Sequence, residues 1–272
     1  SGARTMQLNM FVRRWGKFAP SASLACGVVT LLGTYALASL SSHIPEGMWL
    51  PFISLNGALP PERWLYLIGF WLTGTGILVS AKYAKDSFLW RAESHLHCLA
   101  KSSYYFSLVA AFGLLVQATI PLQSNIFDVI KKEATLQTQS MIHQTGALVL
   151  FLAGYAHCIT MDILLFRSRT LPSSTFSKRL KLVLTILMLA PFFLAFLPHP
   201  ASSVGPKKTV EEMSYGAIGQ WTCVGALLLY FASYHLEFCV THPDGAQAAY
   251  SDHDLLPLAA VQDNLSDTGA EI

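Results

Sequence analysis

Apolar residues along the chain are gathered into six long blocks. The blocks are Pro20 to Leu40, Trp64 to Tyr83, Ser103 to Leu122, His143 to Phe166, Leu182 to Leu197 and Tyr215 to Phe238. A helix rises about 1.5 Å per residue and the hydrocarbon core of a bilayer is about 30 Å thick, so roughly 20 apolar residues cross it as a helix. Five blocks reach that length. The pattern predicts an all-α membrane protein built as a six-transmembrane-helix bundle.

The fifth block, Leu182 to Leu197, is shorter than the others and contains Pro191. It therefore either thins the membrane locally, shelters inside the bundle, or begins within the basic segment that precedes it. A β-barrel would require alternation of apolar and polar residues in segments of about ten residues, and the blocks show no such alternation.

Composition agrees with a membrane protein and divides the chain into three parts. The sequence is 53% hydrophobic and 12% charged, whereas soluble domains carry about 25% charged residues. We expect residues 1–10 to be a tag remnant and a flexible N-terminus, and residues 11–240 to be the transmembrane domain. Residues 241–272 contain acidic residues but no Lys or Arg, which is typical of a disordered tail.

The distribution of Lys and Arg between the blocks predicts the orientation. Thirteen of these residues lie on one side and five on the other, and short loops rich in them stay in the cytoplasm. Both termini and the loop from Arg167 to Lys181 are therefore expected to be cytoplasmic. The net charge of +2 argues against a nucleic-acid partner, because the basic residues border a membrane and can meet anionic lipid headgroups. The simpler interpretation is that these basic residues only set the orientation of the chain in the membrane.

Polar residues inside a membrane are costly unless they are paired or hydrated, so they are candidate functional residues. One group falls in the luminal third of the spans, and it could form a pocket for a lipid headgroup or a luminal loop, or else a clamp between helices with no ligand. No cofactor is expected, although a bound lipid or sterol would be compatible with such a pocket. The residues of this luminal group are Glu62, Arg63, Gln117, His143, Gln144 and Gln220.

A second polar group lies deeper or nearer the cytoplasm and contains His157, Asp162, His235 and Glu237. His157 and Asp162 are five residues apart, about 140° around a helix, so they cannot share one face. Asp162 and His235 are expected at similar depth in the membrane, so they could form a pair between two helices. Zinc hydrolase chemistry would require three converging ligands and an activated water. The simpler interpretation is a structural pair, with no metal and no catalytic residue.

The first luminal loop carries the most distinctive string of the chain. It contains Leu50-Pro51-Phe52-Ile53-Ser54-Leu55-Asn56-Gly57, followed by Pro60-Pro61-Glu62. Further along the chain, His143-x-x-Gly146-Ala147 opens the fourth block, Arg179 precedes the fifth, and Gln220-Trp221 lies in the sixth. In this order the motifs resemble the Frag/DRAM/Sfk family, and within it the damage-regulated autophagy modulators. The resemblance covers about Phe11 to Phe238, but Gln220 stands where the family usually has Glu.

The resemblance implies a function in membranes rather than one chemical activity. It favours a non-enzymatic protein of the lysosomal or late endosomal membrane that modulates autophagy or lipid traffic. The alternative is a lipid-remodelling factor of the Golgi and secretory pathway, of the type that remodels GPI anchors, with hydrolase or transferase chemistry. Membrane lipids are the partners expected in either case.

The C-terminal tail contains a short motif of its own. Asp252-His253-Asp254-Leu255-Leu256 resembles an acidic dileucine sorting signal, in which Asp252 meets a basic site while Leu255 and Leu256 fill apolar pockets. Such a signal predicts that trafficking adaptors bind the tail. A tail with an incidental pair of leucines is the competing interpretation, because motifs of this length arise readily by chance.

Overall fold

The computed structural model describes residues 16–88, 91–126, 135–171, 173–196 and 210–241. Within these residues all regular secondary structure is helical. The six long helices are α2 (Ala19–Leu40), α3 (Glu62–Phe88), α4 (His97–Thr119), α6 (Thr138–Arg167), α7 (Thr175–Phe196) and α8 (Val210–Thr241). Two short 3-10 helices, η1 (Gly16–Phe18) and η2 (Ser94–Leu96), lead into α2 and α4.

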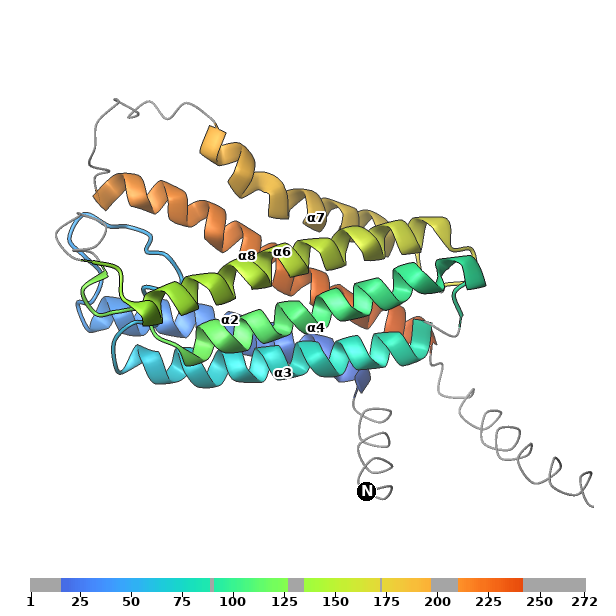
Figure 1. Cartoon of the computed structure of the whole chain (residues 1–272), viewed down its shortest axis with the longest axis horizontal. Coiled ribbons are helices and arrows are strands. Elements are labelled where there is room, and N and C mark those ends of the chain that lie inside the picture. The colour runs from blue at the N-terminus through green and yellow to red at the C-terminus, as the bar shows by residue number, and fades with distance from the viewer. Residues whose placement is uncertain (1–15, 89–90, 127–134, 172, 197–209, 242–272) are drawn as a thin grey trace, which may run out of the picture.

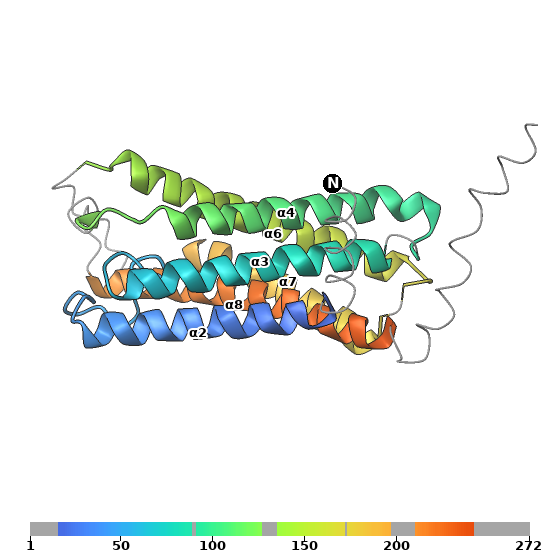
Figure 2. The same cartoon turned by 90° about the horizontal axis from the view of Figure 1, so that it is seen from below.

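The long helices run antiparallel and form a ring in sequence order (Figures 1 and 2). Each helix packs on the next one along the chain, and α8 closes the ring against α2. Residues 41–61 connect α2 to α3 at one end, which we call the first-loop end (Figure 1). The connections from α3 to α4 and from α6 to α7 lie at the opposite end (Figure 1).

Among the described residues, five helical segments are long and apolar enough to cross a membrane. They are Gly16–Leu40, Glu62–Asp86, Ser94–Thr119, Thr138–Arg167 and Met213–Phe238. These segments confirm the membrane class and five of the six predicted spans. The remaining long helix, α7, has 22 residues and is not among the five. It begins at Thr175, inside the basic segment, which was one of the three alternatives for the short fifth block.

The helices extend several residues beyond the apolar blocks. Helix α4 begins at His97, whereas the third apolar block begins at Ser103. Helix α6 begins at Thr138, whereas the fourth block begins at His143. Backbone groups near a membrane surface remain best satisfied within a helix, so a helix continues through polar residues that a hydropathy pattern does not count. The extended ends carry several of the polar residues described below.

The tightest contact in the ring lies between α4 and α6. A Cβ atom added to Gly113 would lie 2.6 Å from the Leu150 backbone nitrogen and 2.7 Å from the Gly146 carbonyl oxygen. Only glycine permits this approach, in the manner of small-residue contacts in membrane helices. The contact fixes α6, and with it His143 and His157, against the polar groups of α4.

Candidate functional site

Polar residues, nearly all of them buried, gather at two depths of the bundle. The outer polar cluster, at the first-loop end, consists of His43, Asn56, Glu62, Arg63 and His143. The inner polar network lies towards the opposite end. It consists of Ser103, His157, Asp162, Ser177, Lys181, Thr185, Tyr230, Ser233, Tyr234 and Glu237.

Arg63 and His143 bind the C-terminal carbonyl groups of α4. One terminal nitrogen of Arg63 donates to the carbonyl oxygens of Ala118 and Thr119, both at 2.6 Å. Nδ1 of His143 lies 2.7 Å from the carbonyl oxygen of Ile120. These carbonyl groups have no partner within α4, and a cation near them is favoured by the helix dipole. Arg63 and His143 therefore have a structural role in ending α4.

Glu62 occupies the first turn of α3 with no exposed surface. One of its carboxylate oxygens lies 2.5 Å from Nδ1 of His43, whose side chain is 30% exposed. Near the same helix, Asn56 is buried in the first loop, and Gly57 beside it packs on the Tyr66 ring. The first loop thus covers the beginning of α3 with polar groups that face inward.

The outer polar cluster leaves several buried polar atoms without a hydrogen-bond partner among the described residues. They are both side-chain polar atoms of Asn56, Oε2 of Glu62, Nη1 of Arg63 and Nε2 of His143. Because Nδ1 of His143 faces a carbonyl oxygen, it carries the hydrogen, and Nε2 of the neutral ring is an acceptor. Arg63 is close enough for its charge to act on His143. The cluster therefore presents both donors and acceptors that no described residue satisfies.

Gln220 and Trp221 hold the first loop rather than the outer polar cluster. The Gln220 side-chain oxygen accepts a hydrogen bond from the Ile53 backbone at 2.7 Å, and the Trp221 indole donates to the Pro51 carbonyl oxygen at 2.9 Å. The two motifs of the family resemblance, 170 residues apart, thus contact each other directly. Their contact joins the first loop to α8.

The predicted luminal pocket is only partly assembled by this arrangement. Glu62, Arg63 and His143 gather as expected, whereas Gln220 binds the first loop. Gln117 is buried, but among the described residues its side chain makes no hydrogen bond to His143 or Gln220. Gln144 is exposed, because it follows His143 on α6 and faces away from the bundle.

His157 is the centre of the inner polar network. Its Nδ1 lies 2.8 Å from the carbonyl oxygen and 3.0 Å from the hydroxyl of Ser103, and its Nε2 lies 2.9 Å from the Tyr234 hydroxyl. The ring stacks on Phe231 at 5.0 Å between centroids. Since a carbonyl oxygen can only accept, Nδ1 donates, and it is not free to take a proton from Ser103. The Ser–His contact therefore lacks the arrangement of an activated nucleophile.

Lys181 and Glu237 form an ion pair with no exposed surface. The ammonium nitrogen lies 3.1 Å from Oε2 of Glu237 and 2.5 Å from the Ser233 hydroxyl, and it lies over the Tyr234 ring. Ser177 donates to the other carboxylate oxygen. The pair connects α7 to α8. Hydropathy places Lys181 in the loop before the fifth apolar block, so the sequence alone does not predict this contact.

Asp162 and His235 are not partners. The carboxylate oxygens of Asp162 accept hydrogen bonds from the hydroxyls of Thr185 at 2.7 Å and Tyr230 at 2.9 Å. His235 lies instead 3.0 Å from the carbonyl oxygen of Lys17. In the described part of the chain, no three His, Cys, Asp or Glu side chains are placed to hold one metal ion.

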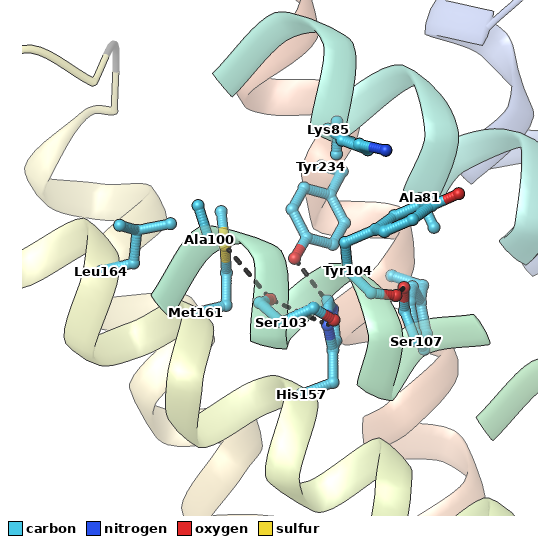
Figure 3. A pocket seen from close by; sticks show the side chains of 12 residues that line it. Ala81, Lys85, Ala100, Ser103, Tyr104, Ser107, His157, Met161, Leu164 and Tyr234 are labelled. Carbon is cyan, nitrogen blue, oxygen red and sulfur yellow. Dashed lines mark hydrogen bonds between the residues drawn. The ribbon is translucent and has the colours of Figure 1, made fainter. Parts of the chain in front are cut away.

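A small cavity reaches the inner polar network between α3 and α4 (Figure 3). It has a volume of about 30 Å³, which is room for a water molecule. Lys85 and Tyr104 stand half-buried at its rim with 4.5 Å between the ammonium and the ring centroid, and the buried Ser103, His157 and Tyr234 line its floor. The cavity places a space of about the size of one water molecule beside His157, at the centre of the network.

The predicted sorting signal, Asp252 with Leu255 and Leu256, and the predicted N-terminal tag remnant lie outside the described residues. The sequence alone predicts no role for Asn56. The only indication in the sequence was its position inside a loop string that also carries the family motifs.

Comparison with known proteins places the chain in a family. No curated protein and no solved structure matches it significantly. A family model described as the Frag1/DRAM/Sfk1/Cwh43P N-terminal domain matches residues 15–239, which include all six long helices up to Cys239. This range is most of the chain, and it confirms the resemblance that the loop motifs suggested. The protein is a multi-pass membrane protein that belongs to the Frag1/DRAM/Sfk1/Cwh43P family.

Proposed function

We propose that this chain is a non-enzymatic six-span protein of the late endosomal or lysosomal membrane that modulates autophagy or lipid traffic. Both termini face the cytoplasm, and α7 is the sixth span. Membrane lipids are its ligands, and the outer polar cluster recognises their headgroups.

The observation that carries this proposal is the set of unpartnered atoms in the outer polar cluster. Buried polar groups in proteins are nearly always hydrogen-bonded, and the exceptions call for an explanation. Here four side chains of one region, Asn56, Glu62, Arg63 and His143, share the deficit. A lipid headgroup carries both donors and acceptors, and it enters from the membrane surface where the cluster lies.

Two further features support the orientation and the absence of catalysis. Basic residues such as Arg91, Arg167 and Arg169 lie at the opposite end of the bundle, as expected for cytoplasmic loops. In the inner polar network, the ring nitrogens of His157 and the carboxylate oxygens of Asp162 are all engaged by neighbouring groups. That network therefore favours a structural role over a hydrolase.

The headgroup site is tested by replacing Asn56 with Leu and measuring lipids that copurify with the protein by mass spectrometry. An unpartnered amide contributes nothing to folding, so Asn56→Leu is expected to keep or raise the melting temperature while bound lipid falls. The matched control is Gln144→Leu, which changes an exposed amide in the same region. Unchanged lipid in Asn56→Leu, or equal loss in both variants, would exclude the cluster as the headgroup site.

The location is tested through the tail. Replacing Leu255 and Leu256 with Ala is expected to move the protein from lysosomes to the cell surface or Golgi without changing its stability. Unchanged lysosomal staining would dismiss the sorting signal. Wild-type protein confined to the Golgi would overturn the endolysosomal assignment and favour the lipid-remodelling alternative.

A further inference from the structure

Two loops at the opposite end of the bundle are joined through one carboxylate. Glu93, in the connection from α3 to α4, accepts hydrogen bonds from the Ser168 hydroxyl at 2.6 Å and from the Arg169 backbone nitrogen at 2.9 Å. The Thr170 hydroxyl donates to the carbonyl oxygen of Arg91 and also lies near Glu93. We call this contact the Glu93 clasp. The residues that form it lie outside the long helices.

The Glu93 carboxylate is negatively charged, and the hydrogen bonds that it receives stabilise that charge. The hydrogen bonds from the Ser168 hydroxyl and the Arg169 backbone lower the pKa of Glu93 from its ordinary 4.5 to about 2. The carboxylate is therefore ionised at every pH that a cell compartment reaches. A second negative group placed beside it would meet like charge.

Thr170 is preceded by two arginines and followed by a proline in the loop between α6 and α7. Arg167 lies three residues before it, Arg169 one residue before it, and Pro172 two residues after it. Its side chain is exposed, and Ser168 before it has extended backbone angles, φ −77° and ψ 135°. Exposed threonines with a preceding arginine fit kinases that select substrates by charge.

We propose that Thr170 is a phosphorylation site, and that the phosphorylated segment 167–171 binds a protein that reads phosphothreonine through a cluster of arginine side chains. In the transfer, the Thr170 hydroxyl oxygen attacks the γ-phosphorus of ATP. The bond from that phosphorus to the bridging oxygen breaks and ADP leaves, while the hydroxyl proton passes to the kinase carboxylate. The site rests on the proposed cytoplasmic orientation of this loop.

Phosphorylation and opening of the clasp are linked by electrostatics. A phosphothreonine carries a charge of about −1.5 to −2 at pH 7. Thr170 lies close enough to Glu93 that the new charge repels the carboxylate and displaces the hydroxyl from Arg91. The loop containing Ser168 and Arg169 then separates from the loop containing Glu93. This exposes the segment in the extended form that phosphopeptide-binding proteins require.

The site is tested on the full chain in detergent micelles, where both ends of the bundle are accessible. The protein is incubated with ATP and a kinase that selects arginine three residues before its target, and the sites are mapped by mass spectrometry. Thr170→Ala is expected to remove the main site. The matched control is Ser94→Ala, because Ser94 is also exposed three residues after an arginine, but follows Glu93 and has no proline two residues later.

Reader binding and clasp opening are measured on the same samples. Phosphorylated wild-type protein is expected to bind a recombinant 14-3-3 protein at least about tenfold more tightly than Thr170→Ala, a difference of about 1.4 kcal/mol. Its amides 168–171 are expected to exchange hydrogen faster. Phosphate on Ser94 instead of Thr170, or phosphorylated Thr170 with neither binding nor faster exchange, would overturn the proposal.

The same measurement in cells separates this proposal from the proposed orientation. Phosphorylation of Thr170 in cells would support both. Efficient modification in micelles together with labelling of a Ser174→Cys variant from the lumen would overturn the orientation, and with it the cellular use of the site. Failure in micelles would overturn the site whichever way the protein faces.

Discussion

The outer polar cluster and the inner polar network use similar residues at similar burial, and they differ in how these residues are satisfied. In the inner polar network, Lys181 meets Glu237 and both nitrogens of His157 have partners. In the outer polar cluster, the side chain of Asn56 has no hydrogen-bond partner among the described residues. Arg63 and His143 each have one side-chain nitrogen that is hydrogen-bonded and one buried nitrogen that is not. Burial alone therefore does not identify a ligand site in this bundle. The unpaired atoms distinguish the end where we propose that a lipid headgroup binds from the end that holds helices together.

The largest effect that this comparison predicts is at the buried ion pair. Replacing Lys181 with Met leaves the Glu237 carboxylate buried without its cation, and we expect a loss of about 3–5 kcal/mol in the free energy of unfolding. The double variant Lys181→Met, Glu237→Leu is expected to recover most of that loss, because no charge remains. Unfolding in detergent gives both values. A double variant as unstable as the single one would contradict a role confined to helix pairing.

A smaller loss is expected at the centre of the inner polar network. Replacing Tyr234 with Phe removes the hydroxyl that contacts Nε2 of His157, and leaving this buried nitrogen unsatisfied costs about 1–3 kcal/mol. The control is Tyr105→Phe, which changes an exposed ring on α4. Equal stability of the two variants would mean that the network tolerates unpaired atoms as the outer polar cluster does, and the comparison would fail.

The contact between the first loop and α8 is expected to be worth less. Replacing Gln220 with Leu removes the acceptor for the buried Ile53 backbone nitrogen and should cost about 1 kcal/mol. The loop should also open, which a Ser54→Cys variant reports through faster reaction with a water-soluble maleimide. If Gln220→Leu leaves the labelling rate unchanged, the loop is held by its aromatic contacts, including Trp49 with Tyr215.

The smallest effect on the whole protein is expected at the Glu93 clasp, where pH is the probe. A lowered pKa means that the clasp stabilises the carboxylate. Its contribution is complete above about pH 4.5 and is lost as the pH falls towards 2. The carboxyl carbon signal of Glu93 in nuclear magnetic resonance should titrate near pH 2, and Ser168→Ala should raise that midpoint. A wild-type midpoint near 4.5 would show that the clasp does not form in solution.

The helices could be predicted from the sequence, because an apolar stretch of about 20 residues has few ways to satisfy its backbone in lipid. The pairings of polar side chains could not. The start of α7 at Thr175 carries Lys181 to the inner face of the bundle, yet hydropathy treats this lysine as part of a loop. Its partner Glu237 is 56 residues away, and no local pattern connects them.

At the candidate site, too, the contacts between polar side chains could not be predicted from the sequence. The first loop and Gln220 were each singled out by the family motifs, but only the folded loop shows that they bind each other. Asp162 and His235 were matched by counting residues along their helices, but Asp162 binds Thr185 and Tyr230, whereas His235 contacts the carbonyl oxygen of Lys17. Depth follows from counting residues, whereas rotation depends on packing between helices such as the contact of Gly113 with α6.

The ion pair between α7 and α8 also constrains how the protein is made. A nascent chain that has reached Phe196 does not yet contain Glu237, the carboxylate that forms the ion pair with Lys181. A lysine without its ion-pair partner is costly in lipid, so if α7 is the sixth span as proposed, we expect it to leave the translocation channel together with α8. The last two helices are then expected to enter the bilayer as one hairpin, and we expect a chain truncated between them to be removed by membrane quality control.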